Sequence, residues 1–134
     1  MRRIVLCSHG SLAAGMKGSL EMIAGPQPGV RAVCAYLSDS PDLSETLSGM
    51  VRDLAPADEL VIVTDVLGGS VNTEASQFAG ARGVTVVTGM NLGFVLSLVL
   101  GDAPTTAQLV DECLEGARAQ LLRIEPAASE DEEF

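Results

Sequence analysis

Basic and aromatic residues are scarce in this sequence of 134 residues, and both shortages narrow the range of functions. Eight lysines and arginines stand against 18 aspartates and glutamates, which gives a formal net charge of -10. Nucleic-acid binding needs lysine and arginine to neutralise phosphates, so the composition argues against that class and favours contacts with basic protein surfaces. Aromatic residues amount to 3%, whereas apolar residues reach 47%. We therefore expect an aliphatic core, which is typical of parallel strands covered by helices.

Cysteine is also sparse. Cys7, Cys34 and Cys113 are odd in number and far apart, and no CxxC pair or Cys/His cluster occurs. This pattern supports neither a zinc site nor a disulfide framework. We expect buried free thiols in a reducing cytoplasm.

Long apolar runs are missing as well. The longest, residues 92–100, falls well below the roughly 20 residues that a membrane helix needs. The run at residues 4–7 is too short for the core of a signal peptide. These features predict a cytoplasmic protein, and the length suits one domain.

Short branched runs alternate with segments of helical spacing along the chain. The sequence predicts strands at 4–8, 30–37, 59–64 and 84–87, and helices at 11–24, 41–54, 70–81, 91–100 and from Thr105 or Thr106 to about Leu122. This order predicts an α/β fold with a doubly wound, mainly parallel sheet and helices on both faces. Residues 121–124 fit either a terminal strand or the end of the last helix. We expect one domain over residues 1–125 and a disordered acidic tail over residues 126–134.

The only histidine of the chain follows the first predicted strand. His9 lies between Ser8 and Gly10, Thr64 and Asp65 end the third strand, and Asn91 follows the fourth. The carboxyl ends of parallel strands meet in one crevice, where function gathers in open α/β sheets. A lone histidine most often hydrogen-bonds a loop carbonyl. Here Gly10 leaves the backbone room and a carboxylate is expected nearby, so the pattern favours a functional His9.

A neutral imidazole attacks phosphorus when one ring nitrogen keeps its proton and the other presents a lone pair. A carboxylate that accepts the first nitrogen's hydrogen bond fixes that tautomer. Asp65 is the candidate for this role. A loop or helix-capping aspartate before the glycine pair is the alternative, and the two roles are compatible.

Gly68, Gly69 and Ser70 follow Asp65 and predict a phosphate-binding turn. Glycines let the backbone approach closely, and exposed amides at a helix start attract a phosphoryl group. A glycine pair before a helix is most often only a tight turn, so the position after Asp65 carries the prediction. No GxxxxGK[ST] or GxGxxG motif accompanies the turn. We therefore expect no bound ATP, NAD or metal, and a phosphate that arrives already attached to another molecule.

Three ordered segments together resemble a known family. SHGSLAAGM at residues 8–16, TDVLGGS at 64–70 and GMNL at 89–92 look like the three signatures of the mannose-type enzyme IIA components of the bacterial sugar phosphotransferase system. The likeness continues from about Arg3 to Leu122.

The resemblance implies a phosphotransferase that carries a phosphohistidine. It implies that the carrier protein HPr phosphorylates His9, and that the phosphate passes to an enzyme IIB partner and so serves the membrane components IIC and IID. Asp65 would orient the imidazole and Ser70 would bind the phosphate, with Gly10, Thr64 and Asn91 flanking the site. A homodimer is also implied, and the exchange of a C-terminal strand between subunits stays open. Because the chain ends in an acidic tail, IIB is expected to be a separate protein.

The sequence departs from the family pattern at two places beside the site. Many members have a proline after the GGS serine and an asparagine two residues later, where this chain has Val71 and Thr73 with Asn72 between them. A Pro-Met pair is common after the third signature, where this chain has Gly93-Phe94. These changes bear on partner fit and loop geometry rather than on the reacting groups.

Three other readings stay open. The phosphotransfer subunit of dihydroxyacetone kinases has a related domain, and a regulatory protein that senses phosphorylation would share the same site. A response-regulator receiver would use Asp65 as the acceptor, but it needs an acidic pair after the first strand, where this chain has Ser8-His9-Gly10. The identity of the sugar cannot be deduced, because in this family the IIA component does not touch it.

Overall fold

Four parallel strands form a single sheet in the computed structural model, which describes residues 1–127. The strands are β1 (Arg2–His9), β2 (Val30–Ala35), β3 (Glu59–Thr64) and β4 (Val84–Thr88), in the order β2-β1-β3-β4. The helices are α1 (Leu12–Ala24), α2 (Leu43–Arg52), α3 (Ser70–Ser76), α4 (Leu92–Leu100) and α5 (Thr106–Gln120). The predicted doubly wound α/β fold is confirmed.

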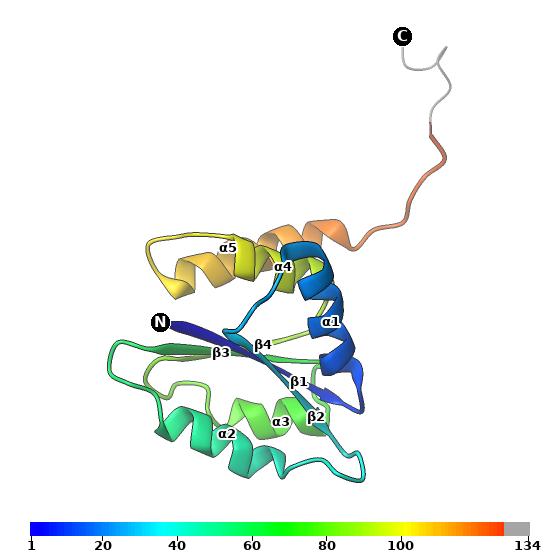
Figure 1. Cartoon of the computed structure of the whole chain (residues 1–134). Coiled ribbons are helices and arrows are strands. Elements are labelled where there is room, and N and C mark those ends of the chain that lie inside the picture. Colours follow the sequence, from blue (N-terminus) through cyan, green and yellow to red (C-terminus); the bar gives the residue numbers. More distant parts are fainter. Residues whose placement is uncertain (128–134) are drawn as a thin grey trace.

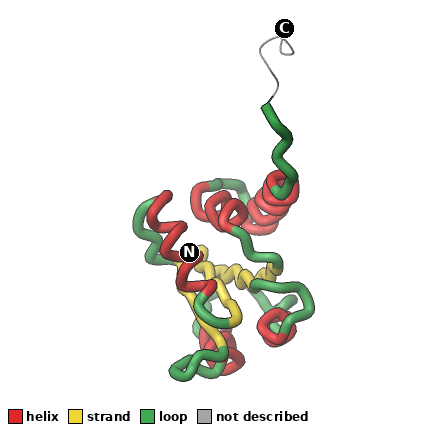
Figure 2. Tube along the Cα trace, turned by 90° about the vertical axis from the view of Figure 1, so that its right-hand side faces the viewer, coloured by secondary structure: helices red, strands yellow, loops and turns green. Residues whose placement is uncertain are grey.

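The helices cover both faces of the sheet. Helices α1, α4 and α5 lie on one face, and α2 and α3 lie on the other (Figure 1). The same layers are visible after a quarter turn, with the strands between the helices (Figure 2). Alternate residues of β1 enter two separate clusters, because successive side chains of a strand point to opposite faces. Leu6 packs in the cluster that contains Leu20 and Phe94, and Cys7 packs in the cluster that contains Leu47.

The strand order reverses between β1 and β3. Helix α1 leads from β1 outward to the edge strand β2, and α2 then returns the chain across the opposite face to β3. Cys7 pairs with Thr64 and His9 pairs with Ala35, so the three strands end at the same level. In open α/β sheets such a reversal creates a crevice beyond the carboxyl ends of the strands.

Two element boundaries differ from the sequence prediction for local reasons. The strand predicted over 30–37 ends at Ala35, because Tyr36 has a positive φ of 66° that leaves the extended region. The helix predicted over 41–54 begins at Leu43 because Asp42 accepts a hydrogen bond from the Glu45 N–H at 2.9 Å. Asp42 is therefore the N-cap, and residue 41 lies outside the helix.

The helix predicted over 70–81 is shorter, and the last helix ends sooner than expected. After Ser76 the backbone makes turn-type bonds, such as Phe78 N–H to the Ala75 carbonyl, until Gly80 takes a φ of 91°. Helix α5 ends at Gln120, and residues 121–127 form neither helix nor strand. Most of the predicted acidic tail, residues 128–134, lies outside the described residues.

The structure shows how far each of the three cysteines is buried. Cys7 and Cys113 are buried, Cys34 is half-buried, and all three are free. Burial, together with the nearby Asp65 charge, raises the pKa of the Cys7 thiol to about 12, so this group stays protonated and unreactive.

Among residues 1–127, no helix is both long enough and apolar enough to cross a membrane.

Helix α1 offers a matched pair of substitutions that measures the value of core packing. Leu20 is fully buried against the sheet, whereas Met22 on the same helix is 88% exposed. We expect Leu20→Ala to lower the free energy of unfolding by about 2–5 kcal/mol, because it leaves a cavity. Met22→Ala should change it by less than about 0.5 kcal/mol. Urea titration measures both, and equal effects would contradict the assigned helix face.

Candidate functional site

His9 and Asp65 meet at the crevice between β1 and β3. His9 is the last residue of β1, and Asp65 directly follows β3. One carboxylate oxygen, Asp65 Oδ2, lies 2.7 Å from His9 Nδ1 and accepts the His9 backbone N–H at 2.8 Å. The other oxygen, Oδ1, accepts the Val66 N–H at 2.9 Å. Asp65 therefore holds both the backbone and the ring of His9.

The carboxylate is well buried, whereas the imidazole is accessible. The Asp65 side chain is 5% exposed and the His9 side chain is 46% exposed. Burial is the largest influence on the Asp65 pKa and raises it, but the hydrogen bonds from His9 and Val66 outweigh burial and lower the pKa below its usual value. An ionised Asp65 accepts hydrogen bonds only, so in the neutral imidazole Nδ1 carries the proton and Nε2 presents its lone pair.

The free nitrogen of His9 faces the Ser70 hydroxyl, which in turn contacts the Tyr36 hydroxyl. Ser70 Oγ lies 3.2 Å from His9 Nε2, and the Tyr36 hydroxyl lies 2.7 Å from Ser70 Oγ. Because Nε2 is the acceptor in this tautomer, Ser70 donates to Nε2 and accepts from Tyr36. The ring centroids of Tyr36 and His9 are 5.3 Å apart, with an interplanar angle of 48°. A continuous hydrogen-bonded chain thus runs from Tyr36 through Ser70 and His9 to Asp65.

Hydrogen bonds within the protein hold the glycine turn that follows β3. The Gly68 N–H donates to Asn72 Oδ1 at 3.1 Å, and the Gly69 N–H donates to the Val66 carbonyl at 3.1 Å. Asn72, in turn, donates through Nδ2 to Thr64 Oγ1 at 3.1 Å. The Gly68 and Gly69 amides, which the sequence predicts as phosphate ligands, are therefore already paired here. Their phosphate-binding role stays a prediction.

Two glycines are needed for local geometry around the imidazole. A Cβ on Gly69 would lie 3.3 Å from His9 Cε1 and 3.3 Å from the Val66 carbonyl oxygen, so a side chain there would crowd the ring. Gly10 has a φ of 59°, which favours glycine, and its N–H donates to the Ala35 carbonyl at 2.9 Å. Gly10 thereby turns the chain from β1 into the approach to α1.

Thr64 ends β3 and supports the site through Asn72, whereas Asn91 follows β4 and caps α4. Thr64 is fully buried and links β3 to the glycine turn through Asn72. Asn91 Oδ1 accepts the Phe94 N–H at 2.8 Å and caps α4. A Cβ on Gly93 would lie 2.8 Å from Gln120 Oε1, which is the far end of a flexible, exposed side chain and can move aside. Phe94 is buried in the core, so packing accounts for the phenylalanine of the unusual pair.

Sequence reasoning missed Tyr36. The predicted strand 30–37 placed this residue inside an extended segment, although it directly follows β2, one residue after Ala35, which pairs with His9. An available signal was its uniqueness, because it is the only tyrosine in a chain without tryptophan. The role of Asn72 was also missed. Its position, one residue before the asparagine expected in the family, concealed its link between Gly68 and Thr64.

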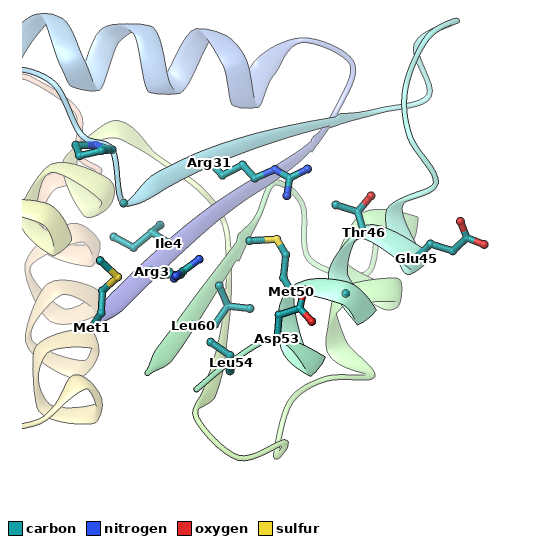
Figure 3. Close-up of a pocket in the computed structure, with 13 residues that line it drawn as sticks. Met1, Arg3, Ile4, Arg31, Glu45, Thr46, Met50, Asp53, Leu54 and Leu60 are labelled. Atoms are coloured by element: carbon teal, nitrogen blue, oxygen red, sulfur yellow. The ribbon is translucent and has the colours of Figure 1, made fainter. Parts of the chain in front are cut away.

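A separate groove lies away from this crevice. This groove of about 640 Å³ lies between helix α2 and the sheet, where β1, β2 and β3 all line it (Figure 3). Arg3 and Arg31 from neighbouring strands extend across it, and Met50 and Leu60 contribute apolar surface. None of the residues predicted for the histidine site lines this groove.

The lowered pKa of Asp65 predicts a pH-dependent contribution to stability. Its folded pKa lies below the unfolded value of about 3.9, so the stabilisation is complete above about pH 4 and is lost as pH falls through the folded pKa. We therefore expect Asp65→Asn to destabilise the fold clearly at about pH 6 and much less at about pH 2–3. Urea titrations at both pH values measure this difference. An effect independent of pH would contradict it, and Asp39→Asn, at an exposed position, is the control.

The fold and site together define a doubly wound α/β protein with an imidazole–carboxylate pair at its switch point. Comparison with known proteins assigns the chain to a family. The EIIA-man family, described as PTS system fructose IIA component, matches residues 3–115. The chain therefore belongs to the EIIA-man family and is a component of a sugar phosphotransferase system (PTS). IIA proteins of this family act with HPr and enzyme IIB.

Solved structures extend the comparison. A proposed phosphoenolpyruvate-dependent sugar PTS permease from Klebsiella pneumoniae is 32% identical, with a TM-score of 0.84 over 91% of this chain and 90% of that one. The PTS component EIIA from Streptococcus agalactiae is 27% identical, with a TM-score of 0.78 over 92% and 97%. The mannose/sorbose-specific IIA subunit from Enterococcus faecalis is 18% identical, with a TM-score of 0.84 over 96% and 98%, and shows the shared fold.

Proposed function

We propose that this protein is a phosphohistidine carrier that accepts a phosphoryl group from HPr on His9 and passes it to a separate enzyme IIB for sugar uptake. The observation that carries the proposal is the arrangement around one imidazole. Nδ1 is held by a buried carboxylate at 2.7 Å, and Nε2 faces hydroxyl donors from the accessible side. This arrangement is what a nucleophilic imidazole requires.

In the proposed transfer, the Nε2 lone pair of His9 attacks the phosphorus of the phosphohistidine of HPr in line. A new N–P bond forms on Nε2 as the donor's N–P bond breaks, and that electron pair returns to the donor nitrogen. The Nδ1 proton stays on His9. The resulting positive ring is stabilised by the Asp65 carboxylate, which already accepts the Nδ1–H hydrogen bond. Transfer to IIB is the same step in reverse, with a nucleophile of IIB as the acceptor.

Donors for the transferred phosphoryl oxygens lie at the start of α3. The Ser70 hydroxyl is already within hydrogen-bond distance of Nε2. Ser70 and Val71 are the first residues of α3, and such positions have no intrahelical acceptor for their N–H groups. These hydroxyl and amide donors would bind the equatorial oxygens, while Gly68 and Gly69 shape the turn that presents them.

Intact-mass spectrometry after incubation with phosphoenolpyruvate, enzyme I and HPr tests the acceptance step. An acid-labile gain of about one phosphate is expected. Addition of a IIB protein should then remove the label, whereas a dihydroxyacetone kinase should not. A label that IIB leaves in place would favour a regulatory phospho-sensor over a transport component.

We also propose that the carrier is a homodimer assembled at the outer edge of β4. In the described chain, β4 is the last strand of the sheet on that side, and the Thr88 hydroxyl is buried without a partner. A groove of about 280 Å³ lies beside Thr88 and Leu121. Leu121 and Ile124 are 92% and 81% exposed, as suits a segment that pairs elsewhere.

Light scattering measures the oligomeric state. We expect about twice the chain mass of 13.8 kDa. Replacing Leu122 by proline, which removes a backbone donor from residues 121–124, should shift the protein toward monomer if these residues pair with β4. Alanine at Leu122 is the control, and a monomeric wild type would contradict the proposal.

A further inference from the structure

We propose that Tyr36 is a phosphoryl ligand of the carrier: its hydroxyl, together with that of Ser70, binds the phosphoryl oxygens of phosphorylated His9 and prolongs the life of the phosphohistidine. This inference rests on the proposed phosphorylation of His9 and adds a residue outside the three sequence signatures. Tyr36 is also the only tyrosine of the chain.

The hydrogen-bond chain around Nε2 gives the first argument. In the free protein, Tyr36 donates to Ser70 at 2.7 Å and Ser70 donates to His9 Nε2 at 3.2 Å. Phosphorylation consumes the Nε2 lone pair, so the Ser70 hydroxyl loses its acceptor. New acceptors, the anionic phosphoryl oxygens, appear at the same place. Two hydroxyl donors are then aligned on a charged acceptor, which strengthens each hydrogen bond.

The backbone of Tyr36 gives a second argument. Tyr36 is the single non-glycine residue with positive φ among residues 1–127, and this conformation is uncommon for a bulky side chain. The loop holds it there, because the Ser40 hydroxyl donates to the Cys34 carbonyl at 2.5 Å and accepts the Leu37 N–H at 2.9 Å. Residues held in sparsely populated conformations cluster at functional sites.

Packing does not account for the position of this ring. Tyr36 is 62% exposed and belongs to neither hydrophobic cluster of the core. Its ring nevertheless lies 5.3 Å from the imidazole of His9, measured between centroids. At that distance we expect the ring to restrict the access of water to a phosphorus bound on Nε2, where attack would break the N–P bond and release inorganic phosphate.

The lifetime of phosphorylated His9 tests the inference. The wild type, Tyr36→Phe and Tyr36→Gly are phosphorylated through HPr, separated from the donor proteins, and followed by intact mass at neutral pH. We expect the label to decay about tenfold faster in Tyr36→Phe, because one hydrogen bond to a charged group is lost. Tyr36→Gly suits the positive φ but also lacks the hydroxyl, so it should lose the label at least as fast.

A spectroscopic signal distinguishes ligation from a purely structural role. With one tyrosine and no tryptophan, tyrosine fluorescence and the tyrosine band of the near-ultraviolet absorption report on Tyr36. Phosphorylation should shift both signals, and hydrolysis should restore them. His9→Ala, treated identically, should show no shift.

Each failure has a distinct meaning. A labelled wild type whose phosphate decays at the same rate in Tyr36→Phe, with an unchanged tyrosine spectrum, overturns the role of Tyr36 and leaves the carrier function intact. A fast decay in Tyr36→Phe that is reversed in Tyr36→Gly also overturns it, because a variant without the hydroxyl would then keep the label as long as the wild type does. No label on the wild type in the presence of active HPr overturns the carrier function and this inference together.

Discussion

Replacing His9 by alanine should abolish phosphate uptake from HPr altogether. The substitution removes the only histidine, and with it the Nε2 lone pair that attacks phosphorus in the proposed transfer. Intact mass should show a gain of about one phosphate in the wild type and none in the variant. His9 is 46% exposed by side chain and ends β1, so we expect the variant to fold. Circular dichroism verifies this, and Ser11→Ala, at an exposed position nearby, is the matched control.

Two results would contradict the His9 assignment. A gain that persists in His9→Ala would place the phosphate on another residue, and Mg²⁺-dependent labelling of Asp65 by acetyl phosphate would then favour a receiver-like acceptor. No gain in the wild type, with demonstrably active HPr, would indicate that the altered flanks at Val71 and Gly93 prevent carrier recognition. The protein would then be reconsidered as a regulator or a binding module.

Asp65→Asn should slow phosphorylation of His9 by about 10²- to 10⁴-fold while leaving the acceptor in place. The Asp65 carboxylate accepts the Nδ1 proton of His9 at 2.7 Å. An amide NH₂ at that place would donate instead, which favours the tautomer with its proton on Nε2 and hides the lone pair that attacks phosphorus. The amide is also neutral, so it stabilises the phosphorylated, positively charged ring less well.

Rapid-quench kinetics with excess phosphorylated HPr measures this effect. Because the chain has one histidine, ¹⁵N NMR reads the tautomer without ambiguity. We expect a proton on Nδ1 in the wild type and a shift toward Nε2 in Asp65→Asn. Asp42→Asn is the control, since Asp42 caps α2 through a side-chain oxygen that asparagine retains. An unchanged rate in Asp65→Asn would show that the carboxylate supports the fold only.

Much of the fold could be predicted because its strands carry strong local patterns. The apolar segment Glu59–Thr64 was placed to the residue. The errors arose where tertiary contacts decide the backbone. Nothing in the local sequence shows that Tyr36 leaves the extended region, or that turns replace the last part of the predicted helix 70–81.

The contacts of the site also fall into those that the sequence predicts and those that it does not. The proximity of His9 and Asp65 could be predicted from the sequence, because both residues follow predicted strands and parallel strands end at a common edge of the sheet. The contacts of Tyr36 and Asn72 could not be predicted, because they depend on side-chain directions in a loop and in a short helix. The pairing of the Gly68 and Gly69 amides with internal acceptors was equally invisible in the sequence.

The four polar residues of the site belong to elements that differ in how deeply they are buried, and we expect these elements to differ in hydrogen exchange. His9 and Asp65 extend from β1 and β3, whose central residues are buried on both faces, whereas Ser70 begins the short α3 and Tyr36 lies in a loop. Amides of the central strands should exchange only through global unfolding, and those of α3 and of the loop through local opening. The nucleophile would thus stay in place on a time scale on which the phosphate ligands fluctuate. In the proposed transfer between two partners, the hydroxyl groups could then rearrange around each partner while the β1 backbone that carries His9 stays in place.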